Sequence, residues 1–437
     1  MNILSLYDGM ACAAIALKQA GIPIDEYHAY EIDPDAIRTA THNFPFIIEH
    51  GDIFNADFTQ FHDIDIIMGG SPCTHWSIAQ KKNRETTASG IGWELFSQYV
   101  KAIHEVKPKY FIYENNESMS ASIQFSISST FGFDPICINS ATVSAQNRKR
   151  LYWVGKRNDD NTYSKVNILQ PEDKGILLRD ILDGAMDLTS NDKAWALTAS
   201  YNGAVAWNTI ERNQRNMVAE PICTSSEGKS HTLKAQYYKN GMANFITNGG
   251  FSSSAVAEPI QYEELSEEYY KGCADGSLVS MIENISVCRN GKQPSQQYRV
   301  YSCDSKSVCV DTDSRKHYII PYDIDFNDSG KPIKATDQNG KEITIYEVHN
   351  SQIAIKGKHY PIELKDGYYI IRKLTIAECK RLQTVPDWYE FPVNNSQAYK
   401  MLGNGWTVDV IVHILRSIFD DQYRPQQTVH CKNMRLW

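Results

Sequence analysis

The sequence lacks several features that would assign it to familiar classes of protein. None of its ten cysteines forms a Cys-x-x-Cys pair, so neither a zinc site nor a disulfide framework is indicated. No apolar run approaches the roughly 20 residues that a membrane helix needs. The start, MNILSLYDGM, lacks the charged and then apolar layout of a signal peptide. We therefore expect a chain that works in a reducing cytoplasm.

Charge is distributed unevenly along the chain. The 437 residues suffice for two or three domains, and 42% hydrophobic and 22% charged residues are typical of a globular protein. The net charge is −8, but residues 1–76 carry 2 Lys/Arg against 11 Asp/Glu (−9), and residues 77–157 carry 11 against 6 (+5). The acidic total argues against indiscriminate binding to nucleic acid. It leaves room for a local basic cleft, because charges act over about 8–10 Å at physiological salt.

Apolar runs and helical patterns alternate along the first part of the chain. The expected elements are helices at 11–20 and 34–42 and strands at 2–7, 26–32, 46–50, 64–68 and 109–113. This rhythm predicts an α/β fold with a doubly wound, mostly parallel sheet. Ligands bind such sheets at the carboxyl ends of the strands. The chemically active residues that follow these strands are Asp8, Glu31, Asp52, Cys73 and Glu114.

From about residue 185 the chain contains short β-prone stretches separated by Gly, Asn and Ser, and within them a repeat. Leu197-Thr-Ala-Ser-Tyr201 returns as Leu233-Lys-Ala-Gln-Tyr237, and Val218-Ala-Glu-Pro-Ile222 returns as Val256-Ala-Glu-Pro-Ile260. Two copies are too few for a solenoid. We expect duplicated β-hairpins over 197–222 and 233–260, with chance similarity as the alternative.

Helical patterns return near the end of the chain. Thr375 followed by Glu378 forms a capping box at the start of a helix that ends by Pro386, and residues 408–419 are amphipathic. The expected division is therefore a first part of a catalytic domain, a large β-rich insertion, and a segment that completes the catalytic domain, at residues 1–184, 185–370 and 371–437.

The sharpest chemical signal is Cys73, which follows Ser71-Pro72 after an apolar strand. A lone cysteine is more often a small buried hydrophobe. The proline, however, gives this cysteine a rigid turn where a crevice is expected. Glu114 follows a neighbouring strand, and in an apolar site its pKa can rise until it donates a proton near neutral pH. On its own, Glu114 would more often be a helix cap or a surface charge.

The segment Gln146-Asn-Arg-Lys-Arg150 adds a basic group. Alternation along an extended segment directs Gln146, Arg148 and Arg150 to one face. Arginine forks bind carbonyl oxygens, phosphates and carboxylates. A solvated sheet edge is the simpler alternative for a basic run of this length.

In this order along the chain, these residues resemble the motifs of the DNA cytosine-5 methyltransferases. The matching motifs are Asp8-Gly9, Glu31, Gly51-Asp52-Ile53, Ser71-Pro-Cys73, Glu114-Asn115, Gln146-x-Arg148-x-Arg150, Arg372-Lys-Leu-Thr, Arg381-Leu-Gln and Gly403-Asn404. The chain departs from the usual pattern in its first loop, in the second Asn after Glu114, and in Gly-Asn-Gly-Trp406. The Asp-Gly loop and Trp406 make the catalytic part look closest to the animal de novo branch and to phage or bacterial enzymes.

The resemblance implies a Rossmann-like methyltransferase sheet and transfer of a methyl group from S-adenosylmethionine (SAM) to carbon-5 of a flipped-out cytosine. In this reaction Cys73 as thiolate adds to carbon-6 and Glu114 protonates or hydrogen-bonds N3. Arg150 holds the cytosine carbonyl, and Arg148 supports the site. Extruding the base costs a few kcal/mol of stacking, which the pocket must recover.

The resemblance also assigns a cofactor site and requires no metal. Glu31 matches the carboxylate on the ribose hydroxyls, and Asp52 the one that reads the adenine amino group. Ile32 and Ile53 would sandwich the adenine, and Tyr7 would face the sulfonium. The remaining residues expected at the cofactor are Gly9, Pro72, Asn404 and Trp406.

The expected partner is double-stranded DNA. The segment after Cys73 resembles a mobile catalytic loop, and residues 185–370 stand in the place of a target-recognition domain that reads base edges. The residues expected to touch DNA are Ser77, Lys81, Lys82, Arg84 and Gln146. We further expect a monomer in a bacterial or phage-infected cell, with a cognate restriction endonuclease as a second partner of such enzymes.

Two alternatives share the same motifs. One is an RNA cytosine methyltransferase of the same lineage, which would methylate transfer RNA. The long insertion favours an enzyme that recognises double-stranded DNA instead. A catalytically silent DNA-binding regulator is disfavoured by the intact Cys73, Glu114 and arginines. A Rossmann dehydrogenase is disfavoured because the first loop contains no Gly-x-Gly-x-x-Gly.

Overall fold

A computed structural model gives the fold. It describes residues 1–72, 75–77, 84–183, 185–188, 192–222, 322–327, 331–337 and 340–419, and short strands at 279–282, 285–286 and 299–300. The chain divides into two compact units. Unit 1 comprises residues 1–182, 190–217 and 373–437, and unit 2 comprises residues 183–189 and 218–372. None of the described helices is long and apolar enough to cross a membrane.

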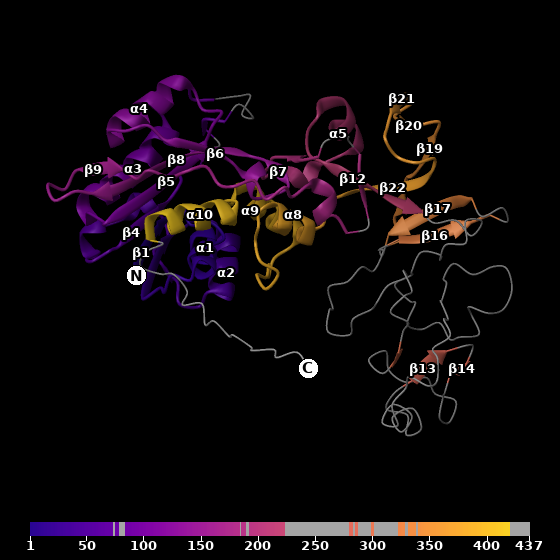
Figure 1. The fold of residues 1–437 in the computed structure, drawn as a ribbon, viewed down its shortest axis with the longest axis horizontal. Helices are drawn as coiled ribbons and strands as arrows, with labels where there is room; N and C mark the ends of the chain where they lie inside the picture. Colours follow the sequence, from indigo (N-terminus) through magenta and orange to yellow (C-terminus); the bar gives the residue numbers. More distant parts are fainter. Residues whose placement is uncertain are drawn as a thin grey trace, which may run out of the picture. The chain divides into compact units, whose positions relative to one another are not determined.

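Unit 1 is built on an eight-stranded sheet. Its strands are β1 (Asn2–Leu6), β2 (Glu26–Tyr30), β3 (Ile48–Glu49), β4 (Ile66–Gly69), β5 (Tyr110–Asn116), β6 (Ile136–Asn139), β8 (Lys149–Arg157) and β9 (Tyr163–Lys165). The order is β3-β2-β1-β4-β5-β8-β6, with β9 on β8. Figure 1 labels β1, β4, β5, β6, β8 and β9 of this sheet. Strands β3, β2, β1, β4 and β5 are parallel, and β8 is antiparallel to β5 and β6. The order reverses between β1 and β4, where doubly wound sheets bind their ligands.

Local sequence signals set the ends of the helices in unit 1. The helices are α1 (Cys12–Ala20), α2 (Pro34–Asn43), α3 (Ile91–Val106), α4 (Ala121–Phe131), α5 (Ala206–Arg212), α8 (Ile376–Leu382), α9 (Asn395–Asn404) and α10 (Val408–Phe419). The Ala-rich helix α1 ends at Gly21, whose φ of 74° suits glycine. Asp33 caps α2 and is followed by Pro34 at the first helical position. The predicted capping box of Thr375 and Glu378 is present at α8.

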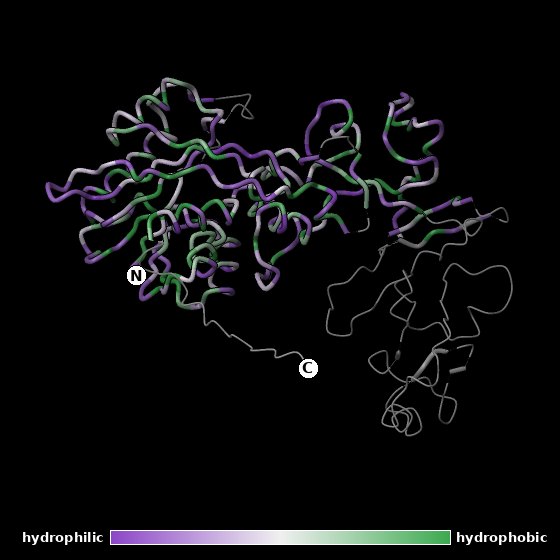
Figure 2. The backbone as a smooth tube through the Cα atoms, in the orientation of Figure 1, coloured by the Kyte–Doolittle hydropathy of each residue, from purple (hydrophilic) through white to green (hydrophobic). Residues whose placement is uncertain are grey.

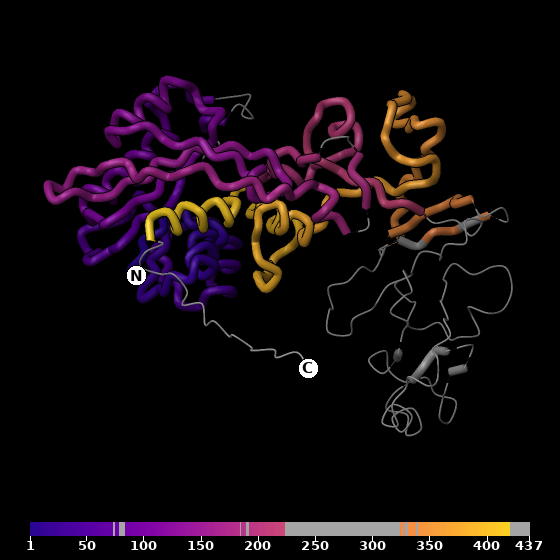
Figure 3. The backbone as a smooth tube through the Cα atoms, in the orientation of Figure 1, coloured from indigo at the N-terminus to yellow at the C-terminus, as the bar shows by residue number. Residues whose placement is uncertain are grey.

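The end of the chain completes unit 1. Helix α10 lies beside α1, so the last described helix packs against the first (Figure 3). Both are hydrophobic over most of their length (Figure 2). A core cluster joins strand residues such as Leu4 and Ile67 to residues of α3 and α4 such as Tyr99 and Ile123. Burial of these side chains fixes the sheet and therefore the positions of the strand ends.

Unit 2 is built from β-strands. Its six-stranded sheet has the order β10-β12-β22-β19-β20-β21, and a three-stranded sheet has the order β16-β17-β18. The bounds are β10 (Met186–Asp187), β12 (Met217–Ile222), β16 (Tyr322–Phe326), β17 (Pro332–Asp337), β18 (Glu342–Ile343), β19 (Ile345–His349), β20 (Gln352–Ile355), β21 (Lys358–Pro361) and β22 (Gly367–Lys373). Short strands β13 (Val279–Ile282), β14 (Ile285–Ser286) and β15 (Arg299–Val300) form a third sheet. Neighbouring strands β12 and β22 are joined by an ion pair of 3.0 Å between Glu220 and Arg372.

The proposed repeat does not form the expected hairpin in its first copy. After Leu197 the chain makes a short turn at Tyr201–Gly203 and then helix α5, before strand β12. Residues 183–189 belong to unit 2, but residues 190–217 pack with unit 1, so the insertion is interrupted by a return to unit 1. The second copy, 233–260, lies outside the described residues. Helix α5 was missed because its seven residues are too few to establish a helical period.

Candidate functional site

A cavity of about 270 Å³ opens at the carboxyl ends of the strands of unit 1. It is lined from β1, β2, β4, β5, β8 and the loop around α9, which meet at the reversal of strand order. Nine of the expected site residues line it: Tyr7, Gly9, Glu31, Pro72, Glu114, Arg148, Arg150, Asn404 and Trp406. The structure therefore brings the expected catalytic and cofactor sides into one cavity.

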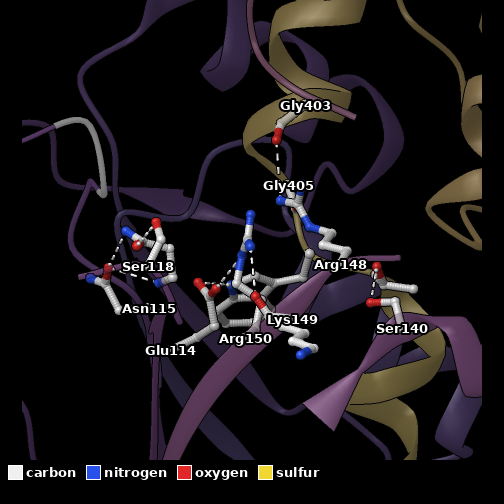
Figure 4. A network of polar contacts seen from close by, with 12 residues as sticks. Glu114, Asn115, Ser118, Ser140, Arg148, Lys149, Arg150, Gly403 and Gly405 are labelled. Carbon is white, nitrogen blue, oxygen red and sulfur yellow. Dashed lines mark hydrogen bonds and ion pairs between the residues drawn. The ribbon is translucent and has the colours of Figure 1, made fainter. Parts of the chain in front are cut away.

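Glu114 stands near the end of β5 with both carboxylate oxygens engaged. Arg150 Nε lies 3.0 Å from Glu114 Oε1, and the Trp406 indole Nε1 donates to Oε2 at 3.0 Å. Figure 4 shows Glu114 and Arg150 facing each other. A Cβ at Gly70 would lie 2.4 Å from the backbone oxygen of Glu114 and 2.9 Å from its Oε2, so glycine after β4 allows both the backbone of β5 and the carboxylate to approach. The carboxyl is thus oriented by three elements.

Arg148 is almost fully buried and binds backbone carbonyls. Its guanidinium donates to Leu197 O at 2.8 Å, to Gly403 O at 3.1 Å and to Gly405 O at 2.8 Å. Figure 4 shows its side chain directed toward Gly403 and Gly405. These hydrogen bonds from Arg148 hold the residues at the end of α9 and after it in place, beside the cavity that Arg148 itself lines.

The two asparagines after Glu114 hold the turn that precedes Cys73. Asn115 Nδ2 donates to Ser71 O at 3.1 Å, and its Oδ1 accepts from Asn116 Nδ2 at 3.1 Å. Ser118 Oγ in turn donates to Asn116 Oδ1 at 2.8 Å. The unusual second asparagine therefore orients the first one. Cys73 itself lies outside the described residues.

The other side of the cavity is acidic. Glu31 accepts the backbone N–H of Gly9 at 2.8 Å, which fixes the first loop on β2. Tyr7 donates to Leu95 O at 2.6 Å, and burial raises the pKa of its phenol well above the usual value. Asp8 accepts from Ser5 at 2.5 Å and Tyr27 at 2.6 Å through Oδ1, while its buried Oδ2 has no hydrogen-bond partner in the described structure.

Asp8, which follows the first strand, is a further functional candidate to which the sequence assigned no separate role. It lines the cavity, and burial raises the pKa of its carboxyl to about 6, with the nearby Glu31 adding to the rise. Glu49 lies behind it with both oxygens buried and unpartnered within the described chain, and burial raises its pKa to about 7. The sequence signal for Asp8 was its place directly after the first strand, in the Asp8-Gly9 loop.

Three of the expected cofactor residues do not line the cavity. Ile53 is 4% exposed and belongs to the core cluster, and its expected place against an adenine ring stays a prediction. Asp52 caps the turn Ile53–Asn55 by accepting from Phe54 N at 3.0 Å. Ile32 is 71% exposed and Phe54 is 44% exposed.

Cys12 is a second thiol near the expected chemistry, and it lines the cavity. Burial raises the pKa of the Cys12 thiol to about 12, although a backbone hydrogen bond from Trp406 opposes the rise. A thiol with this pKa is almost entirely protonated at neutral pH and is a poor nucleophile. Cys12 is therefore a packing residue.

Hydrogen bonds join the described residues on either side of residues 78–83, in the segment after Cys73. Trp76 is fully buried and donates from its indole to Glu85 Oε2 at 3.0 Å, and Gly92 N donates to the same carboxylate at 3.2 Å. Glu85 N donates to His75 O at 2.8 Å. Arg84 donates to Trp76 O at 3.1 Å and to Ser118 O at 2.7 Å. The guanidinium of Arg84 thus links the residues on either side of the segment, and its expected contact with DNA stays a prediction.

Gln146 is also placed differently from the expected DNA contact. It is 0% exposed, its Nε2 donates to Leu382 O at 2.6 Å, and its Oε1 accepts from Leu197 N at 3.1 Å. Complete burial and satisfied hydrogen bonds make it a structural residue. Ser77 is half-buried, and Lys81 and Lys82 lie outside the described residues.

An Asp8→Asn exchange should change how stability depends on pH. The folded chain raises the pKa of Asp8 from 3.8 to about 6, so ionisation of this carboxyl destabilises the folded state as pH rises through that window. The unfolding free energy of Asp8→Asn relative to that of the parent chain should therefore increase by up to about 3 kcal/mol from pH 4 to pH 7.5. Urea unfolding at several pH values measures the gap. A gap that does not change with pH would contradict the burial of an ionising Asp8.

The chain matches known proteins over nearly its whole length. The family described as C-5 cytosine-specific DNA methylase matches residues 1–420. The chain is 24% identical over 452 residues to the orphan methyltransferase M.SPRI of Bacillus phage SPR, covering 96% of this chain and 97% of that protein. It is 27% identical over 253 residues to the type II methyltransferase M1.ScrFI of Lactococcus lactis subsp. cremoris, covering 55% and 62%. A solved prophage-encoded putative DNA modification methyltransferase (E. coli) is 14% identical with a TM-score of 0.45, covering 96% and 99%.

Proposed function

The chain belongs to the C-5 cytosine-specific DNA methylase family, and on this premise we propose that it acts by a covalent route on a flipped cytosine. It is a DNA (cytosine-5) methyltransferase. The proposed finer step is a transient bond between Cys73 and carbon-6 of a cytosine extruded from a specific double-stranded DNA sequence. The single observation that supports it is the cavity that Glu114 and Arg150 share with Tyr7 and Glu31.

The family's methyl donor is SAM, and the acidic side of the cavity suits it. SAM carries positive charge and no phosphate, and the buried Asp8 Oδ2 has no hydrogen-bond partner within the described residues. An amino group could satisfy this oxygen, and Tyr7 offers an aromatic ring near the cationic sulfur. We propose that Glu31, Asp52 and Ile32 bind the nucleoside end. SAM supplies an electrophilic methyl group on its sulfonium.

The chain's own residues provide the rest of the chemistry. Cys73 as thiolate forms the bond to carbon-6, while Glu114 gives a proton or hydrogen bond to N3, so that carbon-5 becomes nucleophilic. Carbon-5 takes the methyl group and loses its proton to a base. The thiolate then leaves with the electron pair of its bond, and Glu114 recovers its proton. We propose that Arg150, which already orients Glu114, also reaches the cytosine carbonyl.

Residues 185–370 are the proposed reader of the target sequence. Phosphate contacts position a protein on DNA, and contacts to base edges specify the site. Deletion of residues 233–260 should change or abolish DNA target choice and leave SAM affinity unchanged. Sequence-resolved methylation and calorimetric SAM binding measure the two effects. A deleted chain that keeps its target site and its activity would refute this assignment.

The experiment that tests the function compares substrates directly. The purified chain is incubated with methyl-labelled SAM and either duplex DNA or transfer RNA, and bisulfite sequencing then maps the modified cytosines. We expect methylation of carbon-5 in DNA at one short sequence. Label on transfer RNA alone, or on an exocyclic amine, would refute the proposal. Because the relatives include orphan and type II methyltransferases, the mapped site also identifies which endonuclease to test as a partner.

A further inference from the structure

We propose that Trp406 is a positioning residue for Glu114, in addition to its place in the wall of the cofactor cavity. The inference rests on the proposed function, because it concerns the carboxyl that meets the cytosine ring. The indole N–H of Trp406 donates to one oxygen of Glu114 and so sets the direction in which the acid faces the flipped base.

The carboxyl is held from two sides. Trp406 Nε1 lies 3.0 Å from Glu114 Oε2, and Arg150 Nε lies 3.0 Å from Oε1. The side chains of Glu114 and Arg150 are 13% and 17% exposed, so little water competes for these bonds. One donor on each oxygen fixes the rotation of the carboxyl plane, which a single donor would leave free. Gly70 leaves space beside the same oxygen that Trp406 binds.

The chemistry of the two donors suits orientation. An indole N–H donates and accepts nothing, and a guanidinium remains protonated at all relevant pH values. Neither group can take the proton that Glu114 exchanges with N3. The two donors therefore orient the acid and leave its proton for the base.

Trp406 is itself held by its neighbours. Gly405 O accepts from Arg148 at 2.8 Å, and Gly405 N donates to Met401 O at 2.7 Å. On the other side, Thr407 Oγ1 donates to Gln383 Oε1 at 2.9 Å. The residue between two anchored positions can place its ring reproducibly. The same ring lines the cavity, so it combines an apolar wall with a polar donor.

Trp406→Phe separates these two duties, because phenylalanine keeps an aromatic wall and removes the N–H. The discriminating readout is release of tritium from carbon-5 of cytosine in DNA without SAM, since addition of Cys73 and proton transfer by Glu114 suffice for this exchange. We expect tritium release and kcat for methyl transfer to fall about 10- to 100-fold, the worth of one hydrogen bond to a charged group. SAM affinity measured by calorimetry should stay within about threefold, since the wall remains.

Trp388→Phe is the matched control. It makes the same chemical change in a 40% exposed indole that contacts Phe44 and Lys18, away from the cavity. It should leave tritium release, kcat and SAM affinity unchanged. Thermal unfolding of all three chains shows whether each variant folds.

Three outcomes overturn the inference. Tritium release at the parental rate in Trp406→Phe shows that the N–H does not act on Glu114. Loss of SAM affinity with normal release shows a wall residue only. Equal losses in release, SAM affinity and thermal stability show a structural role. Absence of both tritium release and methyl transfer in the parent chain refutes the proposed function itself. This result differs from failure of the Trp406 inference because it is seen before any substitution is made.

Discussion

Replacement of Cys73 by serine should abolish methyl transfer while SAM and DNA still bind. A serine hydroxyl is a much weaker nucleophile than a thiolate toward carbon-6, so the covalent step fails although the shape of the residue is nearly kept. We expect at least a thousandfold loss of kcat, comparable to the loss of a catalytic nucleophile in other covalent enzymes. Labelled-methyl incorporation measures the rate, and calorimetry and gel shift measure binding.

Covalent trapping gives a second measure of the same step. DNA with 5-fluorocytosine at the target should remain attached to the parent chain. After methylation the hydrogen on carbon-5 normally leaves as a proton, and a fluorine in its place cannot leave as a cation, so the thiolate is not released. Cys73→Ser should form no such adduct. Cys12→Ser is the matched control, since Cys12 is buried with a pKa raised to about 12, and it should trap DNA as the parent does. An adduct that survives Cys73→Ser and is lost in Cys12→Ser would contradict the assignment.

Arg148→Met should destabilise unit 1 and weaken SAM binding together. The substitution keeps a long apolar side chain but leaves the carbonyls of Leu197, Gly403 and Gly405 without their donor. Gly405 O keeps a hydrogen bond of 3.5 Å from Gln383 Nε2. Each of the other two buried carbonyls left unsatisfied costs about 1–3 kcal/mol, so we expect a loss of about 2–6 kcal/mol in unfolding free energy. Calorimetric melting measures it. SAM affinity should fall because Asn404 and Trp406 lie on the loop that Arg148 fastens.

Lys149→Met is the control for this substitution. Lys149 is the exposed next residue, at the start of β8, and removal of a surface charge usually changes stability by less than about 0.5 kcal/mol. Arg148→Lys should recover only part of the loss, because an ammonium cannot reproduce the fork that spans three carbonyls. Melting of Arg148→Met at the parental temperature would show that these hydrogen bonds contribute nothing measurable.

The catalytic half of the fold could be predicted from its sequence because its signals are local. The alternation of apolar runs gave the parallel strands, Pro34 and the Thr375–Glu378 pair gave helix starts, and residues 408–419 form a helix with the predicted bounds. The gathering of Glu114, Arg150 and Glu31 in one cavity followed from the rule that ligands bind at strand ends.

The contacts that the sequence did not predict join side chains far apart along the chain. Gln146 alternates with Arg148 as predicted, yet it faces the buried loop at Leu382 instead of solvent. Arg84 meets Ser118, 34 positions away in the chain. Trp406 reaches Glu114 across 292 positions. Neither residue type nor periodicity contains such partners, because they are set by the packing of the whole unit.

The pairing of β12 with β22 has a consequence for how this molecule tolerates change in length. The chain departs into the inserted region along one of these strands and comes back along the other, side by side and clamped by Glu220 and Arg372. Strand pairing thus holds the two ends of the inserted region together, whatever sequence lies between them. Because loop-closure entropy grows only logarithmically, doubling the insert costs about 0.6 kcal/mol. The inserted region can therefore be lengthened, shortened or exchanged during evolution while the strands of unit 1 and their cavity are kept.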